Sequence, residues 1–362
     1  MRTLLPLAWV ALLLAFILPI ADDNRLFSYP SALGYAAMLT VTAAVSLRRR
    51  RELLWLHGVI AAMGTAAVLL LLNDMEQTQA GYWLLLLSVW LQTWFFSERL
   101  SRCGGYARPA QFIVPIFFGI ALLMLWEAVT RGAGVSPVLL PPPSAIAARL
   151  TTETSVLFDD FRQTVLKAVL IGYFIGCASG AMVAIWVDRV PFLRRGLLPM
   201  GNFIAALPIV GIAPIMVMWF GFDWQSKAAV VVVMTFFPML VNTVAGLHDH
   251  STIERDLMTT YAANYRQRLL KLNLPAAMPF VFNALKINST LALIGAIVAE
   301  FFGTPIVGMG FRISTEVGRM NLDMVWAEIT VAALTGTAFY GILSLLEQKV
   351  VFWHPSVRRA NH

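Results

Sequence analysis

STIERDLMTTYAANYRQRLLKLNLP, residues 251–275, is a long polar segment between two strongly apolar blocks of this chain. Its apolar side chains recur every four residues, which places them on one face of an α-helix. They are Ile253, Leu257, Tyr261, Tyr265 and Leu269. Ser251 followed by Glu254 predicts a capping box at the start of the helix, and Pro275 predicts a break at its end. The segment is too polar to cross a bilayer, so we expect one amphipathic helix that lies on the membrane surface or docks into a partner.

The composition of the 362 residues indicates a membrane protein, because 59% are hydrophobic, 13% are charged and the mean hydropathy is +0.72. Soluble domains carry about 25% charged residues. Apolar runs of about 20 residues, bounded by charges, predict an all-α protein that crosses the membrane many times. The net charge of +7 lies mainly in short loops, where it orients the chain, and it does not indicate a nucleic-acid partner. Cys103 and Cys177 are far apart in the sequence and predict neither a disulfide nor a metal site.

The first 108 residues contain four expected spans. They are Leu4–Ala21, Ala32–Leu47, Leu53–Leu72 and Gly81–Phe96. Residues 4–21 also have the form of a signal peptide, but they lack a clean A-x-A cleavage site, which favours a retained span. The arginines at 48–51 predict a cytoplasmic loop, and the charges of the other short loops agree with that orientation. We therefore expect residues 1–108 to form an accessory bundle of four helices with both ends in the cytoplasm.

Residues 109–352 contain six further expected spans. They are Gln111–Ala128, Thr164–Val187, Leu197–Phe220, Ala228–Leu247, Phe280–Phe302 and Val325–Leu346. The third is interrupted by prolines, and broken backbone at membrane depth is tolerated where it lines a cavity. Glycines in the second predict close helix packing. An amphipathic helix is expected over residues 144–161. A total of ten transmembrane helices puts residues 251–275 and the tail, residues 353–362, in the cytoplasm.

An amphipathic cytoplasmic helix that ends in Leu-Pro and precedes the last two spans resembles the EAA loop of bacterial ABC importer permeases. With Leu274–Pro275 as anchor, the family pattern E-A-A-x-x-x-G-A aligns with Asp256, Leu257, Met258, Ala262 and Ala263, and only Ala263 matches it literally. Other segments resemble the branch for nitrate, sulfonates and taurine, which includes permeases for bicarbonate and thiamine-pyrimidine precursors. They are residues 140–145, 206–227, 237–242, 284–287 and 292–303.

The chain has no G-x-x-x-x-G-K-[ST] motif for phosphate binding, so in such a transporter Mg-ATP would bind to another chain. The resemblance implies a cytoplasmic ABC ATPase dimer with a groove for this helix, a periplasmic substrate-binding protein, a homodimer of this chain in the bacterial inner membrane, and no cofactor on this chain. The residues expected to couple to the ATPase are Ile253, Asp256, Leu257, Tyr261, Ala262, Ala263, Tyr265, Arg266 and Leu269. The alternative is a helix that lies in the lipid headgroups.

Polar residues inside the expected spans are candidates for the translocation path, because such residues are costly in a membrane. The candidates are Asn202, Asn242, Asn283, Asn288 and Glu300, together with Pro208 in the broken span. The alternative for each asparagine is a hydrogen bond to a neighbouring helix, and the alternative for Glu300 is an interfacial or loop-bonded carboxylate. His248-Asp249-His250 carries alternate histidines, but without further ligands it predicts a solvated turn rather than a metal site.

The expected function is a permease subunit that forms the path for a small polar solute such as a sulfonate, nitrate, taurine or a pyrimidine. No Ser/His/Asp or Cys/His arrangement indicates an enzyme. The sequence leaves two other classes open. One is an ion-coupled secondary transporter acting alone, which would need coupling charges deep in its spans. The other is a membrane scaffold without a transport role.

Overall fold

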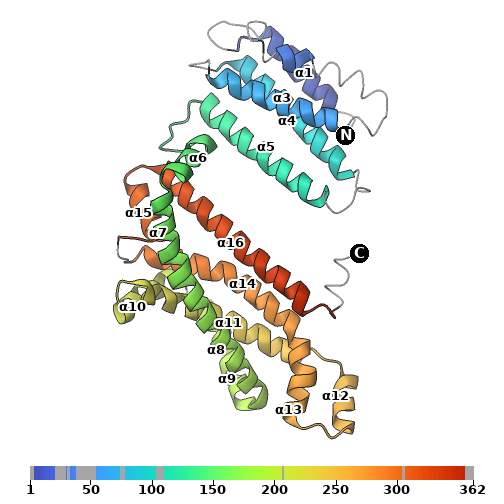
Figure 1. The fold of residues 1–362 in the computed structure, drawn as a ribbon, viewed down its shortest axis with the longest axis vertical. Coiled ribbons are helices and arrows are strands. Elements are labelled where there is room, and N and C mark those ends of the chain that lie inside the picture. The colour runs from blue at the N-terminus through green and yellow to red at the C-terminus, as the bar shows by residue number, and fades with distance from the viewer. Residues whose placement is uncertain are drawn as a thin grey trace. The chain divides into compact units, whose positions relative to one another are not determined.

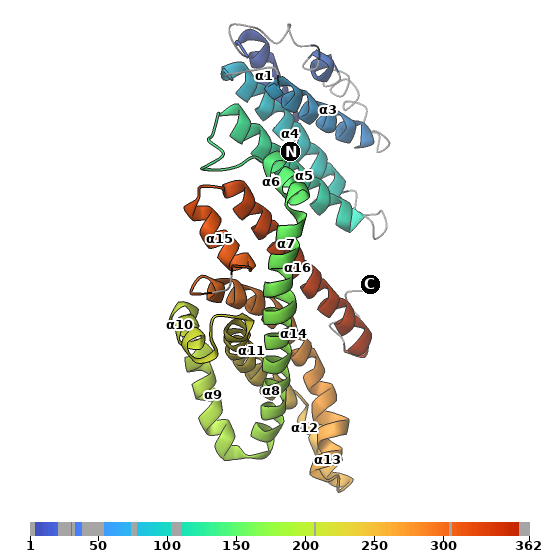
Figure 2. The same cartoon turned by 60° about the vertical axis from the view of Figure 1, so that its left-hand side comes forward.

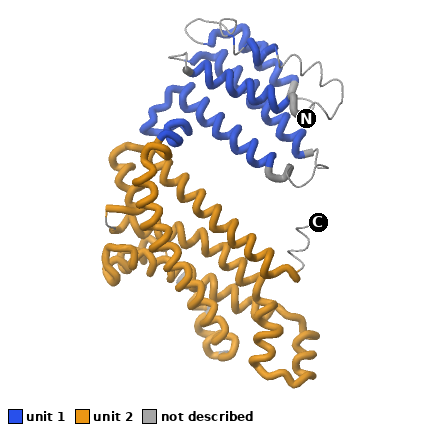
Figure 3. Tube along the Cα trace, viewed as in Figure 1, with its two compact units in different colours: residues 1–148 blue, residues 149–362 orange. Residues whose placement is uncertain are grey.

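The computed structural model describes residues 4–20, 30, 33–37, 54–73, 78–102, 110–205, 208–303 and 306–354. All regular elements in these residues are helices, which confirms the predicted all-α class. The chain divides into two compact units, residues 1–148 and residues 149–362 (Figure 3).

The first unit is a bundle of apolar helices (Figure 1). Its helices are α1 (Leu4–Ile17), α3 (Leu54–Asn73), α4 (Ala80–Arg102), α5 (Ala110–Gly132) and the first part of α6 (Pro143–Thr152). The central helix is α4, which packs against α1, α3 and α5. The buried Tyr82 donates from its hydroxyl to the carbonyl of Ala128 at 3.0 Å, and the hydroxyl of Thr78 donates to the carbonyl of Gly132. These bonds hold α5 in the first unit, so the unit extends past residue 108.

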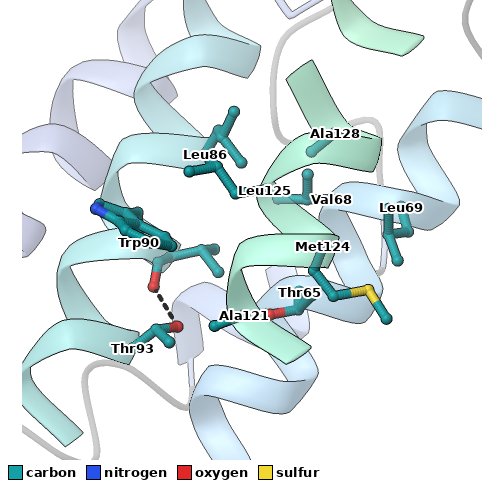
Figure 4. Close-up of a pocket in the computed structure, with 11 residues that line it drawn as sticks. Thr65, Val68, Leu69, Leu86, Trp90, Thr93, Ala121, Met124, Leu125 and Ala128 are labelled. Atoms are coloured by element: carbon teal, nitrogen blue, oxygen red, sulfur yellow. Dashed lines mark hydrogen bonds between the residues drawn. The ribbon is translucent and has the colours of Figure 1, made fainter. Parts of the chain in front are cut away.

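A narrow cavity lies between α3, α4 and α5 (Figure 4). Its volume is about 20 Å³, which is room for about one water-sized sphere. Trp90, Met124 and Leu125 are among the side chains that line it. The hydroxyl of Thr93 at its edge already donates to the carbonyl of Val89 at 2.8 Å. The cavity is therefore a packing gap in a helix bundle, too small for a solute.

The second unit is also built of helices, and the longest of them run from one end of the unit to the other (Figures 1 and 2). Its elements are α7 (Thr154–Phe161), η3 (Arg162–Val169), α8 (Leu170–Arg189), α9 (Pro191–Ala205), α10 (Ile209–Phe220), α11 (Trp224–Leu247), α12 (Thr252–Thr260), α13 (Tyr265–Arg268), η4 (Leu269–Asn273), α14 (Leu274–Glu300), α15 (Met309–Gly318) and α16 (Leu322–Val350). The two η elements are π-helical turns. The short helices α12 and α13 lie at one end of the unit, and α10 and α15 lie toward the other.

Small residues bring α8 and α11 into close contact, as the glycines in the sequence predict. A Cβ atom on Gly172 would lie 2.6 Å from the carbonyl oxygen of Ala228, and one on Gly176 would lie 2.0 Å from the hydroxyl of Thr235. The amide of Asn288 in α14 donates to the carbonyl of Thr235 at 2.8 Å. These contacts make α8, α11 and α14 the packed core of the second unit.

Five helices in the described part of the chain are long and apolar enough to cross a membrane. They are Ile113–Gly132, Thr154–Arg189, Trp224–Leu247, Tyr265–Glu300 and Leu322–Val350. Shorter apolar helices cover Pro6–Ile17, His57–Leu72 and Ile209–Phe220. Most of the predicted second span, residues 32–47, and all four arginines at 48–51 lie outside the described residues. The total of ten spans therefore stays a prediction.

Three boundaries differ from those predicted. The helix expected over residues 144–161 is interrupted at Glu153, and its second half continues through η3 into α8. The span expected over residues 197–220 is two helices, because Pro208 is extended and begins α10. Pro275 does not end the helix, because Tyr265–Glu300 is one helical run in which the π-helical turn η4 lies directly before Leu274 and Pro275.

Candidate coupling and translocation sites

The predicted capping box is present at the start of α12. The N–H of Glu254 donates to Oγ of Ser251 at 3.2 Å, and the N–H of Ser251 donates to Oε2 of Glu254 at 2.9 Å. The hydrogen bond from the backbone N–H of Ser251 lowers the pKa of Glu254 from its ordinary value. No residue of α12 is buried. Within the residues that the structure describes, this helix is therefore stabilised by its own cap and buries no side chain against other elements.

A Schellman motif ends α12, so the segment is not the single helix that its apolar spacing predicts. The N–H of Ala263 donates to the carbonyl of Met258 and the N–H of Ala262 donates to the carbonyl of Thr259, both at 2.9 Å. Ala262 has a φ of 52°, in the left-handed region that glycine adopts most easily. The glycine of the family pattern aligns with Ala262, so the motif explains why a glycine suits that position.

A second capping box begins the next helix. The N–H of Gln267 donates to Oδ1 of Asn264, and the N–H of Asn264 donates to Oε1 of Gln267, both at 2.9 Å. The turn between the two helices gives α13 a different direction from α12. Tyr265 and Leu269 are half-buried in consequence, and they leave the face that the sequence spacing assigns to them.

Three of the predicted coupling residues form an exposed apolar row on α12. Ile253 is 79% exposed, Leu257 55% and Tyr261 78%. Their spacing of four residues keeps them on one face of the helix. The other candidates surround this row or follow it. Asp256, Ala262 and Arg266 are exposed, and Ala263 is half-buried. The row is an apolar surface that the described part of the chain leaves uncovered.

Tyr265 points back into the second unit. Its hydroxyl donates to Oδ2 of Asp188 at 2.9 Å, and its ring centroid lies 5.4 Å from the guanidinium carbon of Arg189. Both partners lie in the last turn of α8. The structure therefore separates Tyr265 from the exposed row and joins it to α8.

The predicted asparagines of the translocation path have different surroundings. Asn288 is fully buried, and its Nδ2 donates to the carbonyl of Thr235 at 2.8 Å and to Sγ of Cys177 at 3.3 Å. Asn242 is half-buried and donates to the carbonyl of Pro238 in its own helix at 2.8 Å. Asn283 and Pro208 are exposed, and the side chain of Asn202 lies outside the described residues. Asn288 therefore forms hydrogen bonds to neighbouring helices, which was the alternative to a role in the translocation path.

Glu300 lies at the end of α14 and is 2% exposed. Its Oε1 accepts from the hydroxyl of Thr164 at 2.8 Å, and its Oε2 accepts from the N–H of Gly310 at 2.7 Å. The N–H of Met309 donates to the same threonine oxygen at 2.8 Å. These bonds hold the first residues of α15, so Glu300 is a buried, loop-bonded carboxylate in this structure.

Asp160 is a second buried anchor of α15 that is not among the site residues predicted from the sequence. Its carboxylate accepts from the N–H of Gly308 at 2.6 Å and from Nε of Arg312 at 2.8 Å. Burial disfavours the charged form of Arg312, but the bond and charge of Asp160 outweigh it and raise the pKa of Arg312. Helical spacing in the sequence could have indicated that Asp160 is buried, because it shares the packed face of the helix with Leu157 and Thr164.

Two lysines in the second unit also donate hydrogen bonds within that unit. Nζ of Lys286 donates to Oε2 of Glu347 at 2.7 Å, which joins α14 to α16. Nζ of Lys227 donates to the carbonyl of Phe222 at 2.6 Å and to the carbonyl of Gly303. Within the residues that the structure describes, no group of three or more His, Cys, Asp or Glu side chains is arranged to hold a metal ion.

The described residues form only helices as regular elements, five of them able to span a membrane, with a capped, exposed helix between two of the long ones, which are features of a membrane transport subunit. The family described as binding-protein-dependent transport system inner membrane component matches residues 168–352, and the chain belongs to this family. It is the membrane permease subunit of an ABC importer, a transport protein and not an enzyme.

Relatives from several organisms are similar in sequence to about two thirds of this chain. The formylaminopyrimidine transport permease ThiX of Halalkalibacterium halodurans is 31% identical over 249 residues, which are 68% of this chain and 98% of that protein. The riboflavin transport permease RibX of Chloroflexus aurantiacus is 29% identical over 239 residues, 65% of this chain and 88% of that protein. The taurine transport permease TauC of Escherichia coli is 25% identical over 244 residues, 66% and 88% respectively.

Membership of this family sets aside the secondary transporter acting alone and the scaffold without transport. Permeases of the family are multi-pass proteins of the inner membrane. They work with an ATPase and a substrate-binding protein.

Proposed function

We propose that α12 is the helix through which this permease is coupled to a cytoplasmic ABC ATPase dimer. The observation that supports the proposal most strongly is the exposed row of Ile253, Leu257 and Tyr261 on a helix that is capped but not packed. An apolar row at this spacing suits a helix that lies in a groove of a partner. Burial of each side chain of this size contributes about 1.5–3 kcal/mol, so the row can supply most of the docking energy.

Charged residues beside the row would orient the docked helix. Asp256 and Arg266 are exposed, one on α12 and one on α13. Ion pairs at such exposed rims contribute about 0–1 kcal/mol each, which is less than the apolar contacts. They therefore contribute more to the register of the helix in its groove than to its affinity. Mg-ATP would bind to the ATPase, and this chain would carry no cofactor.

The end of the unit with α12 would face the cytoplasm. Arg189, Arg194 and Arg195 surround the short connection between α8 and α9 at that end, as the positive-inside rule requires of a cytoplasmic loop. The other end would then face the periplasmic binding protein, with α15 as part of its contact surface. With the predicted total of ten spans, both termini would then lie in the cytoplasm.

A homodimer would complete the translocation path. Asn283, Ile287, Thr290 and Ile294 recur at helical spacing on α14, and all four are exposed in the single chain. An amide that faces hydrocarbon without a partner is costly. A second copy of the chain, with a polar path between the two copies, would give Asn283 suitable surroundings. In this proposal residues 109–352 form the permease core, residues 1–108 an accessory bundle and residues 353–362 a cytoplasmic tail.

The solute would be a small polar molecule of the kinds for which the relatives are named, such as a pyrimidine or a taurine-like sulfonate. Lys286 is paired with Glu347 at 2.7 Å, so its charge is already balanced within the chain. This pairing favours selection of the solute by the binding protein over tight binding of an anion by the permease. A native mass spectrum of the cognate binding protein with its retained ligand would identify the solute.

Co-purification tests the coupling role. We expect Leu257→Asp combined with Tyr261→Asp to abolish binding of the ATPase after gentle detergent extraction, because two charges would have to enter an apolar groove. Arg255→Gln combined with Thr259→Asp is the matched control. It makes the same change in net charge on the opposite face of α12, and we expect it to retain the ATPase.

Insertion of both double variants is checked by their yield from the membrane and by size-exclusion chromatography. If the variant with charges in the apolar row retains the ATPase as the control does, α12 is not the docking helix and the proposal fails.

A further inference from the structure

The two connections that flank α12 meet at one carboxylate, Asp188, in the last turn of α8. His248 caps the end of α11 before α12, and Tyr265 begins α13 after it. The hydroxyl of Tyr265 donates to Oδ2 of Asp188 at 2.9 Å, and Nε2 of His248 lies 3.4 Å from Oδ1. The side chain of Asp188 is only 8% exposed, so water screens these contacts weakly. Asp188, Arg194, His248 and Tyr265 are called the Asp188 cluster below.

The partners of His248 define its hydrogen positions and bring in a fourth helix. Nδ1 lies 2.9 Å from the carbonyl oxygen of Val244, which can only accept, so Nδ1 carries a hydrogen. Nε2 lies 3.1 Å from the guanidinium of Arg194, which can only donate, so Nε2 accepts from Arg194. His248 therefore lies beside the Asp188 carboxylate without donating to it, and the hydrogen bond to Asp188 comes from Tyr265. Arg194 belongs to α9. The Asp188 cluster therefore connects α8, α9, α11 and α13 at the end of the unit where α12 is exposed.

Two arginines fix the orientation of the Tyr265 ring. The guanidinium carbon of Arg189 lies 5.4 Å from the ring centroid, and that of Arg268 lies 5.9 Å from it. Both distances are within the range of a cation–π interaction. These contacts restrict the ring to the direction in which its hydroxyl reaches Asp188. The first residue of α13 is thus attached to α8 by a directed contact.

The helix that carries Asp188 also carries the anchors of α15. Thr154–Arg189 is one continuous helical run of 36 residues, which is about 54 Å long at 1.5 Å per residue. Asp160 and Thr164, which bond to α15, lie near one end of it, and Asp188 lies at the other. Gly176 between them packs closely on Thr235 of α11, so the middle of the run is held against that helix. A shift of the Asp188 end is therefore transmitted along a stiff, tightly packed rod.

We propose that Asp188 is the positioning residue that transmits movement of α12 to α8, and through α8 to the anchor of α15. The inference rests on the proposed coupling of α12 to the ATPase. Because both connections of α12 meet at the Asp188 cluster, displacement of α12 by the ATPase pulls on α8 through the Asp188 carboxylate. Loss of the carboxylate leaves the apolar row of α12 intact, so it separates docking from transmission.

Hydrogen exchange of the complex with its ATPase measures this transmission without knowledge of the solute. The complex is assembled in lipid nanodiscs, and exchange is compared without nucleotide and with Mg-ATP plus vanadate. In the wild-type complex we expect the nucleotide to change the exchange rates both in α12 and in residues 306–318, which include α15. In Asp188→Ala and in Tyr265→Phe we expect the change in α12 to persist and the change in residues 306–318 to fall about tenfold, the size of a typical coupling between sites.

Three further variants distinguish transmission from a general loss of structure. Asp249→Ala removes an exposed carboxylate from the same connection as His248, and Tyr340→Phe removes the hydroxyl of an exposed tyrosine on α16. We expect both to respond to nucleotide as the wild type does. Asp188→Asn keeps one oxygen to accept from Tyr265, and we expect it to restore most of the response that Asp188→Ala loses.

The outcomes separate this inference from the proposed function. If the wild-type chain binds no ATPase, both fall. If it binds the ATPase and responds at residues 306–318, and Asp188→Ala and Tyr265→Phe respond equally, the role of Asp188 is refuted while the coupling role of α12 stands. Where Asp188→Ala does not fold, Tyr265→Phe decides the question, because it removes a single hydroxyl and keeps the ring between its two arginines.

Discussion

Replacement of Asp160 by asparagine should loosen α15 from the second unit. Asp160 is fully buried and accepts from the N–H of Gly308 and from Nε of Arg312. Asparagine has nearly the same shape, but it has one oxygen and an amide group that donates. One of the two donors would therefore face another donor, and Arg312 would lose its bonded counter-charge.

The size of the effect follows from the burial of the pair. Removal of one partner of a buried ion pair costs about 3–5 kcal/mol. Arg312 retains 21% exposure of its side chain, so water replaces part of the lost interaction and the lower end of that range applies. A loss of about 3 kcal/mol would lower the unfolding midpoint by about 6–12 °C in a unit of this size.

Thermal unfolding of the purified chain in detergent, followed by tryptophan fluorescence, measures this loss, and hydrogen exchange of residues 306–318 locates it. Asp159→Asn is the matched control, because it makes the same chemical change one residue earlier at an exposed position. A surface substitution of this kind shifts stability by no more than about 0.5 kcal/mol. If both variants unfold at the same temperature and exchange equally over α15, the bonds of Asp160 do not hold α15 and the reasoning is wrong.

Three further predictions concern α12 and the core. Ala262→Gly should slow hydrogen exchange in α12, because it relieves a left-handed strain of about 1–2 kcal/mol that exceeds the entropy cost of glycine, about 0.5–1 kcal/mol. Gly176→Ala should lower the unfolding midpoint by the equivalent of about 1–3 kcal/mol, since its Cβ would lie 2.0 Å from a hydroxyl of α11, whereas Gly341→Ala, with open space around it, should not. The cap of α12 should weaken in acid. The pKa of Glu254 is lowered in the folded state. The contribution of its carboxylate to the stability of α12 is therefore fully present above the ordinary pKa of 4.5, and it is lost as the pH falls through the lowered pKa. Glu254→Gln, which can still accept from Ser251, should remove this pH dependence, and unchanged dependence in that variant would exclude the cap as its source.

Local features of the fold were determined by the sequence. The apolar runs predict helices because each places about 20 residues in hydrocarbon. Ser251 and Glu254 predict a cap because their partners are three residues apart and need no distant contact. The glycines of α8 predict close packing because the absence of a side chain lets any neighbouring helix approach the backbone.

The candidate site was predicted only in part. The spacing of Ile253, Leu257 and Tyr261 correctly indicates a common face, and their exposure follows from the polar composition around them. The same spacing wrongly adds Tyr265 and Leu269 to that face. A prediction from periodicity assumes a continuous helix, so it does not detect the turn that Ala262 makes in the left-handed conformation.

Tertiary structure alone decided which polar groups meet. Glu300 reaches Thr164 across 136 positions of sequence, and Tyr265 reaches Asp188 across 77. No local pattern encodes such pairs, because they depend on where the helices cross. The sequence thus determined that the chain crosses a membrane and presents a polar, capped helix between its spans. The packing of α8, α11 and α14 decided that the carboxylates anchor α15 and that the connections of α12 converge on α8, since a buried carboxylate must find its donors wherever the folded helices bring them.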